Sequence, residues 1–226
     1  MMFKNKIIGD DRHFIEQTRF ENCNIGNFCS FAKGCLFINC TFGNSNSFGE
    51  GCRFKTCTFG RKCVFADKCI LGMLCRVGTH ATFGNRCTVS GSRISCCSKF
   101  GKWCTFAAEC RFNSGCTFGE RCYFGKNTDF KGTVKFGERN FISRGSAFYS
   151  PEKVHFSGVF HTDEFVNIVV DGYPVAVRHV VVVNSGGVDK NAVMYFLENG
   201  NVYVTSCGRI MQAPARHTLA DLMDLG

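Results

Sequence analysis

Apolar residues recur along most of the chain at a spacing of six residues, with an occasional step of five. The series begins at Phe14 and ends at Phe148, and a small residue, most often Cys, stands two places before most of its members. Residues two places apart point to the same side of a β-strand. Each repeat therefore predicts a short strand with two inward-facing side chains, and the series predicts a solenoid.

The steps of five indicate how many sides the solenoid has. They lie between residues 20 and 25, 37 and 42, 54 and 59, and 89 and 94, so each is the second step in a set of three. A coil then takes 17 or 18 residues, whereas a four-sided solenoid of pentapeptides would take about 20. We expect a three-sided prism of eight coils, about 38 Å tall at roughly 4.8 Å per coil.

Three vertical columns of inward-facing residues follow, one for each side. The first column is Phe14, Phe31, Phe48, Phe65, Phe83, Phe100, Phe118 and Phe136. The second is Phe20, Phe37, Phe54, Leu71, Val89, Phe106, Phe124 and Ile142, and the third is Ile25, Phe42, Phe59, Val77, Ile94, Phe112, Phe130 and Phe148. Fourteen of the 17 Cys stand at the small positions, and the exceptions are Cys96, Cys97 and Cys207. We expect these fourteen thiols to be buried, reduced and packed as small hydrophobic groups.

The repeat resembles that of a known family. Cys-Thr-Phe-Gly-Glu-Arg at 116–121 is similar to the repeat of the left-handed β-helix hexapeptide-repeat proteins, with Phe in the aliphatic position. This resemblance implies a left-handed β-helix over residues 14–148 and a homo-oligomer, most often a trimer. The abundance of Cys and Phe also resembles small repeat proteins of phages and prophages that carry the label polymer-forming cytoskeletal.

Outside the repeat the pattern changes, so we divide the chain into a lead-in or cap (1–13), the β-helix (14–150) and a small α+β domain (151–226). Residues 153–160, 164–171 and 175–183 have strand patterns. Asn199-Gly200 between residues 194–198 and 201–205 is typical of a two-residue hairpin. Thr218 and Asp221 form a capping box that predicts a short final helix over 219–225.

Charge and hydropathy narrow the choice of location and partner. The net charge is +9, which favours an anionic partner. No run of 18 apolar residues is present and residues 1–14 do not read as a secretory signal. We therefore expect a cytoplasmic protein with no membrane partner, in a compartment where thiols stay reduced.

Outward-facing basic residues form two columns. Arg76, Arg93 and Arg111 lie in consecutive coils on the third side, and no acidic residue lies beside Arg76 or Arg93 there. The corner after the first side carries Lys68, Arg86, Trp103, Arg121 and Arg139, with Glu120 and Glu138 adjoining. Stacked guanidinium groups repel each other unless an anion lies nearby. The columns predict a site for a nucleotide, a nucleic-acid backbone or an acidic protein face; a solubilising surface is the alternative.

The candidates for catalysis are weaker. Hexapeptide-repeat enzymes are mostly acyltransferases with a catalytic His, and His80, at a corner, is the one His well inside the repeat. Stacked interior thiols do not converge tetrahedrally, so we expect no metal site and no cofactor. Cys96-Cys97 is a candidate reactive pair, and Phe28 and Phe141, outside the columns, are candidates for an interface.

Three functions remain open. The leading hypothesis is a non-enzymatic oligomeric binding or scaffold protein, in particular a phage-encoded counter-defence inhibitor of a host defence protein or its nucleotide signal. The first alternative is an acyltransferase that uses acyl coenzyme A, with His80 as general base. The second is a self-assembling filament, since unpaired strand edges invite stacking. A DNA mimic conflicts with the positive charge.

Overall fold

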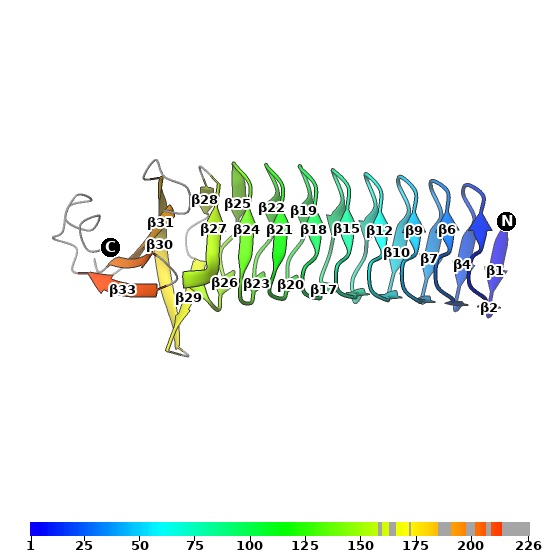
Figure 1. Ribbon diagram of the computed structural model, residues 1–226, viewed down its shortest axis with the longest axis horizontal. Helices are drawn as coiled ribbons and strands as arrows, with labels where there is room; N and C mark the ends of the chain where they lie inside the picture. The colour runs from blue at the N-terminus through cyan, green and yellow to red at the C-terminus, as the bar shows by residue number, and fades with distance from the viewer. Residues whose placement is uncertain are drawn as a thin grey trace.

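The protein is an all-β solenoid (Figure 1). The computed structural model describes residues 1–157, 160–162, 166–171, 173–184, 191–197, 202–206 and 209–213. Within these residues the one helical element is the 3-10 helix η1 (Pro151–Lys153), and no helix is long and apolar enough to cross a membrane. The strands wind into three parallel sheets, one per side, as the repeat predicted.

Each sheet forms one face of the prism. The first face consists of β3 (His13–Phe14), β6 (Ser30–Phe31), β9 (Ser47–Phe48), β12 (Val64–Phe65), β15 (Thr82–Phe83), β18 (Lys99–Phe100), β21 (Cys116–Phe118), β24 (Val134–Phe136) and β27 (Val154–Phe156). The second face consists of β1 (Met2–Lys4), β4 (Arg19–Glu21), β7 (Leu36–Ile38), β10 (Arg53–Lys55), β13 (Ile70–Leu71), β16 (Thr88–Val89), β19 (Thr105–Phe106), β22 (Tyr123–Phe124), β25 (Asn140–Ile142) and β28 (Phe160–Thr162).

The third face is the longest sheet. Its parallel part consists of β2 (Ile7–Ile8), β5 (Asn24–Ile25), β8 (Thr41–Phe42), β11 (Thr58–Phe59), β14 (Arg76–Val77), β17 (Arg93–Ile94), β20 (Arg111–Phe112), β23 (Asp129–Phe130), β26 (Ala147–Phe148) and β29 (Val166–Val170). It continues as an antiparallel meander of β30 (Tyr173–Asn184), β31 (Asn191–Leu197), β32 (Val202–Ser206) and β33 (Arg209–Ala213).

The strand register confirms the three inward columns. Phe31, for example, pairs with Phe14 and Phe48 on the first face. Rings within a column stack nearly parallel, as Phe31 does on Phe48 at 5.2 Å, whereas rings of neighbouring columns meet edge to face, as Phe31 and Phe37 do at 4.9 Å. Both arrangements suit the quadrupole of an aromatic ring. The prism axis is therefore filled mainly by stacked phenyl groups, with the aliphatic side chains of Leu71, Val77, Val89 and Ile94 in two middle coils.

The fourteen cysteines at small positions are buried and form no disulfides, as expected. Several thiols donate a hydrogen bond to a backbone carbonyl of another coil, as Cys69 does to Gly49 O at 3.3 Å. Burial raises the pKa of Cys110 to about 11. Cys207 lies outside the described residues.

The solenoid extends beyond the repeat at both ends and has nine complete coils, where the repeat predicted eight. At the amino-terminal end β1 and β2 pair in parallel with β4 and β5, so residues within 1–13 are part of a coil. At the other end β27, β28 and β29 continue the three faces. Strands over 153–160 and 164–171 were expected, but as part of a separate domain, because η1 lengthens the step from Phe148 to Phe156. At the amino-terminal end the repeat was not followed because Lys6 replaces the small residue before Ile8.

Apart from η1, the elements in the described part of 151–226 are β-strands. β31 and β32 pair antiparallel with Tyr195 opposite Tyr203, in agreement with the predicted hairpin, whose turn lies outside the described residues. Tyr195 is buried and its hydroxyl donates to Pro151 O at 3.3 Å, which ties the meander to η1. The expected final helix over 219–225 also lies outside the described residues, so the α+β assignment stays a prediction.

Three corners join the faces of each coil: the first corner joins the first face to the second, the second corner joins the second to the third, and the third corner leads to the next coil. A residue with positive φ stands at each corner, such as Lys68 at 59°. Its backbone N–H donates to a carbonyl of the next coil, at 2.9 Å from Lys68 N to Asn85 O. Corner residues therefore stack in vertical columns as regularly as strand residues do.

Candidate anion-binding site

Three arginines form a column on the outside of the third face. Arg93 pairs in register with Arg76 above it and Arg111 below it, and all three side chains are exposed. They point outward because the residues on either side of each, such as Cys75 and Val77 around Arg76, fill the core. The structure thus brings together the first column that the sequence predicted.

The lower end of this column is neutralised and the upper end is not. Arg111 pairs with Asp129 of the next coil, at 3.5 Å between Nε and Oδ2. Above the column the register partner of Arg76 is Thr58. Within the described part of the chain no carboxylate forms an ion pair with Arg76 or Arg93. Positive charge is therefore concentrated at these two guanidinium groups.

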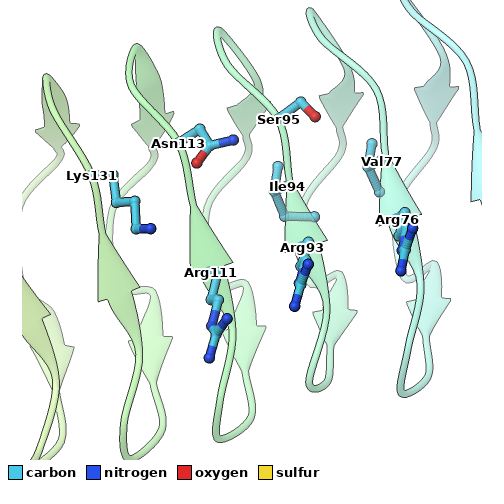
Figure 2. Close-up of a pocket in the computed structure, with 8 residues that line it drawn as sticks. All are labelled: Arg76, Val77, Arg93, Ile94, Ser95, Arg111, Asn113 and Lys131. Carbon is cyan, nitrogen blue, oxygen red and sulfur yellow. The ribbon is translucent and has the colours of Figure 1, made fainter.

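A shallow groove of about 310 Å³ runs beside the arginine column. Figure 2 shows the arginines in one row and a second row of polar side chains across the groove. The lining residues are Arg76, Val77, Arg93, Ile94, Ser95, Arg111, Asn113 and Lys131. Because the side chains of Val77 and Ile94 are buried, the floor is mainly backbone. The rims carry guanidinium, hydroxyl, amide and ammonium groups.

The sequence analysis missed the second rim, Ser95, Asn113 and Lys131, although a signal was present. Each stands directly after a third-face column residue, where the earlier coils carry Gly9, Gly26, Gly43, Gly60 and Gly78. A Cβ on Gly78 would lie 2.4 Å from Gly60 O, and from Gly26 to Gly78 the coils stack too closely for a side chain. Arginine replaces the Thr of earlier coils from Arg76 onward, and a polar residue replaces Gly one coil later, from Ser95 onward. The two adjacent columns therefore change character one coil apart.

The second basic column lies on the opposite side of the prism. Lys68, Arg86, Trp103, Arg121 and Arg139 all have positive φ at the first corner, which faces away from the third face. Lys68 pairs with Glu50, and Lys102, beside Trp103, pairs with Glu120 at 3.0 Å. The Arg121 guanidinium lies 4.6 Å from the centre of the Trp103 ring. The two columns are therefore separate surfaces.

The remaining candidates are dispersed. His80 is exposed at the third corner, where its backbone N–H donates to Cys96 O at 3.0 Å, and it is not among the residues that line the groove. Cys97 follows it in the same corner column and is exposed, while Cys96 is half-buried. Phe28 is exposed at the same corner, and Phe141 stacks on Tyr123. No group of three or more His, Cys, Asp or Glu in the described residues could hold a metal ion.

Comparisons with known proteins add no assignment to this geometry. The sequence matches no protein-family model, and no curated protein matches it.

Proposed function

We propose that the protein is a non-enzymatic binding protein that takes a multiply charged anion, such as a phosphate-bearing ligand, in the groove of the third face. The observation that carries the proposal is the column of Arg76 and Arg93, which have no ion pair with a described carboxylate, facing a row of hydrogen-bond donors. Guanidinium groups bind phosphate oxygens in a bidentate manner, and hydroxyl and ammonium donors complete such a site.

Electrostatics favour a bound anion. Register places Arg76 and Arg93 one coil apart, roughly 4.8 Å. Two unit charges at about 5 Å repel each other by about 1 kcal/mol in water and about 3 kcal/mol at an effective dielectric constant of 20. An anion between them adds two attractions that outweigh this repulsion, and these are lost when the anion leaves. The groove is therefore stabilised by its ligand.

The biological role that we propose is sequestration of the bound anion. A stiff β-helix that captures an anion would act by sequestration, without turnover. A phage-encoded inhibitor of a host defence protein or of its nucleotide signal would work in this way, and the resemblance to Cys- and Phe-rich phage repeat proteins supports that role. Left-handedness and assembly into a trimer belong to the same proposal and rest on the resemblance to hexapeptide-repeat proteins.

The test is isothermal titration calorimetry with inorganic pyrophosphate. We expect saturable binding that weakens with added salt and is lost in Arg93→Glu. Arg53→Glu is the matched control because Arg53 is equally an exposed, outward-facing strand residue but lies on the second face. Absence of binding at millimolar pyrophosphate, or the same loss in both variants, would exclude a specific groove site.

A further inference from the structure

Aromatic and basic side chains, exposed except for the half-buried Phe141, alternate along the edge of the prism opposite the groove. Arg121 stands at the first corner and Tyr123 follows it on the second face; in the next coil Arg139 and Phe141 take the same positions. Trp103 occupies the corner one coil earlier. We call this set the basic–aromatic edge: Arg86, Trp103, Arg121, Tyr123, Arg139 and Phe141.

The rings of this edge are held rigidly while remaining accessible. Trp103 is 50% exposed and Tyr123 is 44% exposed. The Tyr123 ring stacks on Phe141 with the ring centres 5.3 Å apart, and its hydroxyl lies 2.9 Å from Ser143 Oγ. The Arg121 guanidinium packs against Trp103. Large aromatic groups fixed in outward positions on a soluble surface are typical of a contact site.

The stack of rings on the second face ends abruptly at Tyr123. The outward column runs from Thr88 through Thr105 to Tyr123, Phe141 and His161. One face of the Tyr123 ring is covered by Phe141. The other face points toward the preceding coil, where the register partner of Tyr123 is Thr105, whose side chain is short. Trp103 stands two residues before Thr105 in the same coil. A planar ring placed over Thr105 would therefore extend the stack on Tyr123.

The cations of the edge follow one line. Arg86, Arg121 and Arg139 stack at the first corner, with coils roughly 4.8 Å apart. Glu120 is already paired with Lys102, so it does not cancel Arg121. Glu138 is exposed beside Arg139 and is the other carboxylate within this stretch of the corner. The edge is therefore basic along its length, with an open ring face between its cations.

We propose that the basic–aromatic edge binds single-stranded nucleic acid. One base stacks on the open face of Tyr123 and covers the short side chain of Thr105, next to Trp103. The phosphates on either side of this base contact Arg86 and Arg121. Non-specific single-strand sites combine a line of cations with aromatic rings on which bases stack. A duplex keeps its bases stacked on each other and leaves the Tyr123 face empty. The edge and the groove lie on opposite sides of the prism, so this proposal does not rest on the first.

The test is fluorescence anisotropy with a labelled oligothymidylate of about twelve nucleotides, a length within known single-strand site sizes. We expect Tyr123→Ala to weaken binding by about 5- to 150-fold, the range that loss of one stacked base implies. Tyr123→Phe keeps the ring and is expected to keep most of the affinity. Tyr173→Ala removes another exposed tyrosine, on β30, and is the matched control.

Trp103 supplies a second readout because it is the single tryptophan of the chain. Oligothymidylate is expected to quench its fluorescence, whereas pyrophosphate in the groove is not. Three results would overturn the proposal: no binding, equal binding of an abasic oligomer or of a duplex, or an equal loss of affinity in Arg93→Glu and Arg121→Glu. The last result would indicate diffuse attraction of a polyanion or binding in the groove.

Discussion

Whether a residue faces the axis or the solvent determines its chemistry in this protein. Cys110 and Cys97 show the contrast: the first is fully buried beside phenyl rings, and the second stands exposed at a corner. Burial penalises the thiolate and raises the pKa of Cys63 and Cys110 to about 11 and that of Cys116 to about 12. These three interior thiols are therefore protonated and unreactive at neutral pH.

Stability is expected to fall as the pH rises above 9. These thiols titrate near 9.0 when unperturbed, whereas in the folded chain burial raises the pKa of Cys63 and Cys110 to about 11. Between these values the unfolded chain binds fewer protons, so the free energy of unfolding decreases with pH. The contribution of these protonated thiols to the free energy of unfolding is fully present below about pH 9 and is lost as the pH rises past about 11. Urea unfolding at a series of pH values measures it.

The control for this prediction is Cys110→Ala. This variant is expected to be less stable at pH 7, by about 1 kcal/mol for the lost side-chain volume, and to lose less stability between pH 9 and 11. A pH profile of the same slope in both proteins would show that other groups cause the decline.

At the scale of the elements, two- and three-residue strands are stable only because every coil packs on the next in register. Where coils approach most closely the residue is Gly. A Cβ on Gly60 would lie 2.5 Å from Gly43 O, a backbone atom directly after β8 that cannot move aside without shifting its coil. The glycines after the third-face strands, from Gly26 to Gly78, are thus needed for close contact between coils. Glycines with positive φ at the corners, such as Gly34, are explained by their backbone conformation instead.

Gly60→Ala is therefore expected to destabilise the protein by about 1–3 kcal/mol, the usual cost of an overpacked contact. Gly9→Ala is the matched control: Gly9 occupies the same position in its coil, and a Cβ there would meet nothing within 4 Å. Denaturant unfolding of the two variants compares them. Equal effects would mean that backbone entropy, and not the contact between coils, explains the glycines.

At the scale of the molecule, the prism presents surfaces of different character in different directions. The groove and the basic–aromatic edge point to opposite sides. A small apolar patch of Ile70, Met73 and Leu74 lies on the second face and second corner. Leu74 has a φ of 63°, in a corner column where other coils carry Asn22 and Asn39. A large apolar side chain exposed at this corner is a candidate for a contact between copies of the chain.

We expect the protein to form a homo-oligomer, with a trimer of about 75 kDa as three times the 25.1 kDa chain. Light scattering after size-exclusion chromatography measures the mass. Leu74→Asn should weaken the association without loss of the fold, because Asn tolerates left-handed φ and occupies the same corner in other coils. A monomeric wild-type protein would contradict the prediction, and an unchanged mass in the variant would place the interface elsewhere.

Much of the fold could be predicted because, in a six-residue repeat, the position of a residue in the sequence determines whether its side chain points inward or outward. The Phe columns, the buried thiols and the column from Arg76 to Arg111 all follow from counting, since register in a parallel solenoid repeats the order of the chain. That the outermost strands belong to the solenoid could not be predicted, because the pattern of small and apolar residues lapses at Lys6 and at η1 while backbone pairing continues. Hydrogen bonds between coils require no particular side chain.

For the candidate site, the sequence specified which side chains face outward, and only the tertiary structure decided which of them meet. The opening of the groove between the arginines and Ser95, Asn113 and Lys131 depends on the spacing of coils around them. The pairing of Arg111 with Asp129, and the open face of Tyr123 above Thr105, depend on rotamers and neighbours one coil away. The side to which a side chain points is set locally within its strand, whereas the distance between side chains of different coils is set by the packing of the whole solenoid.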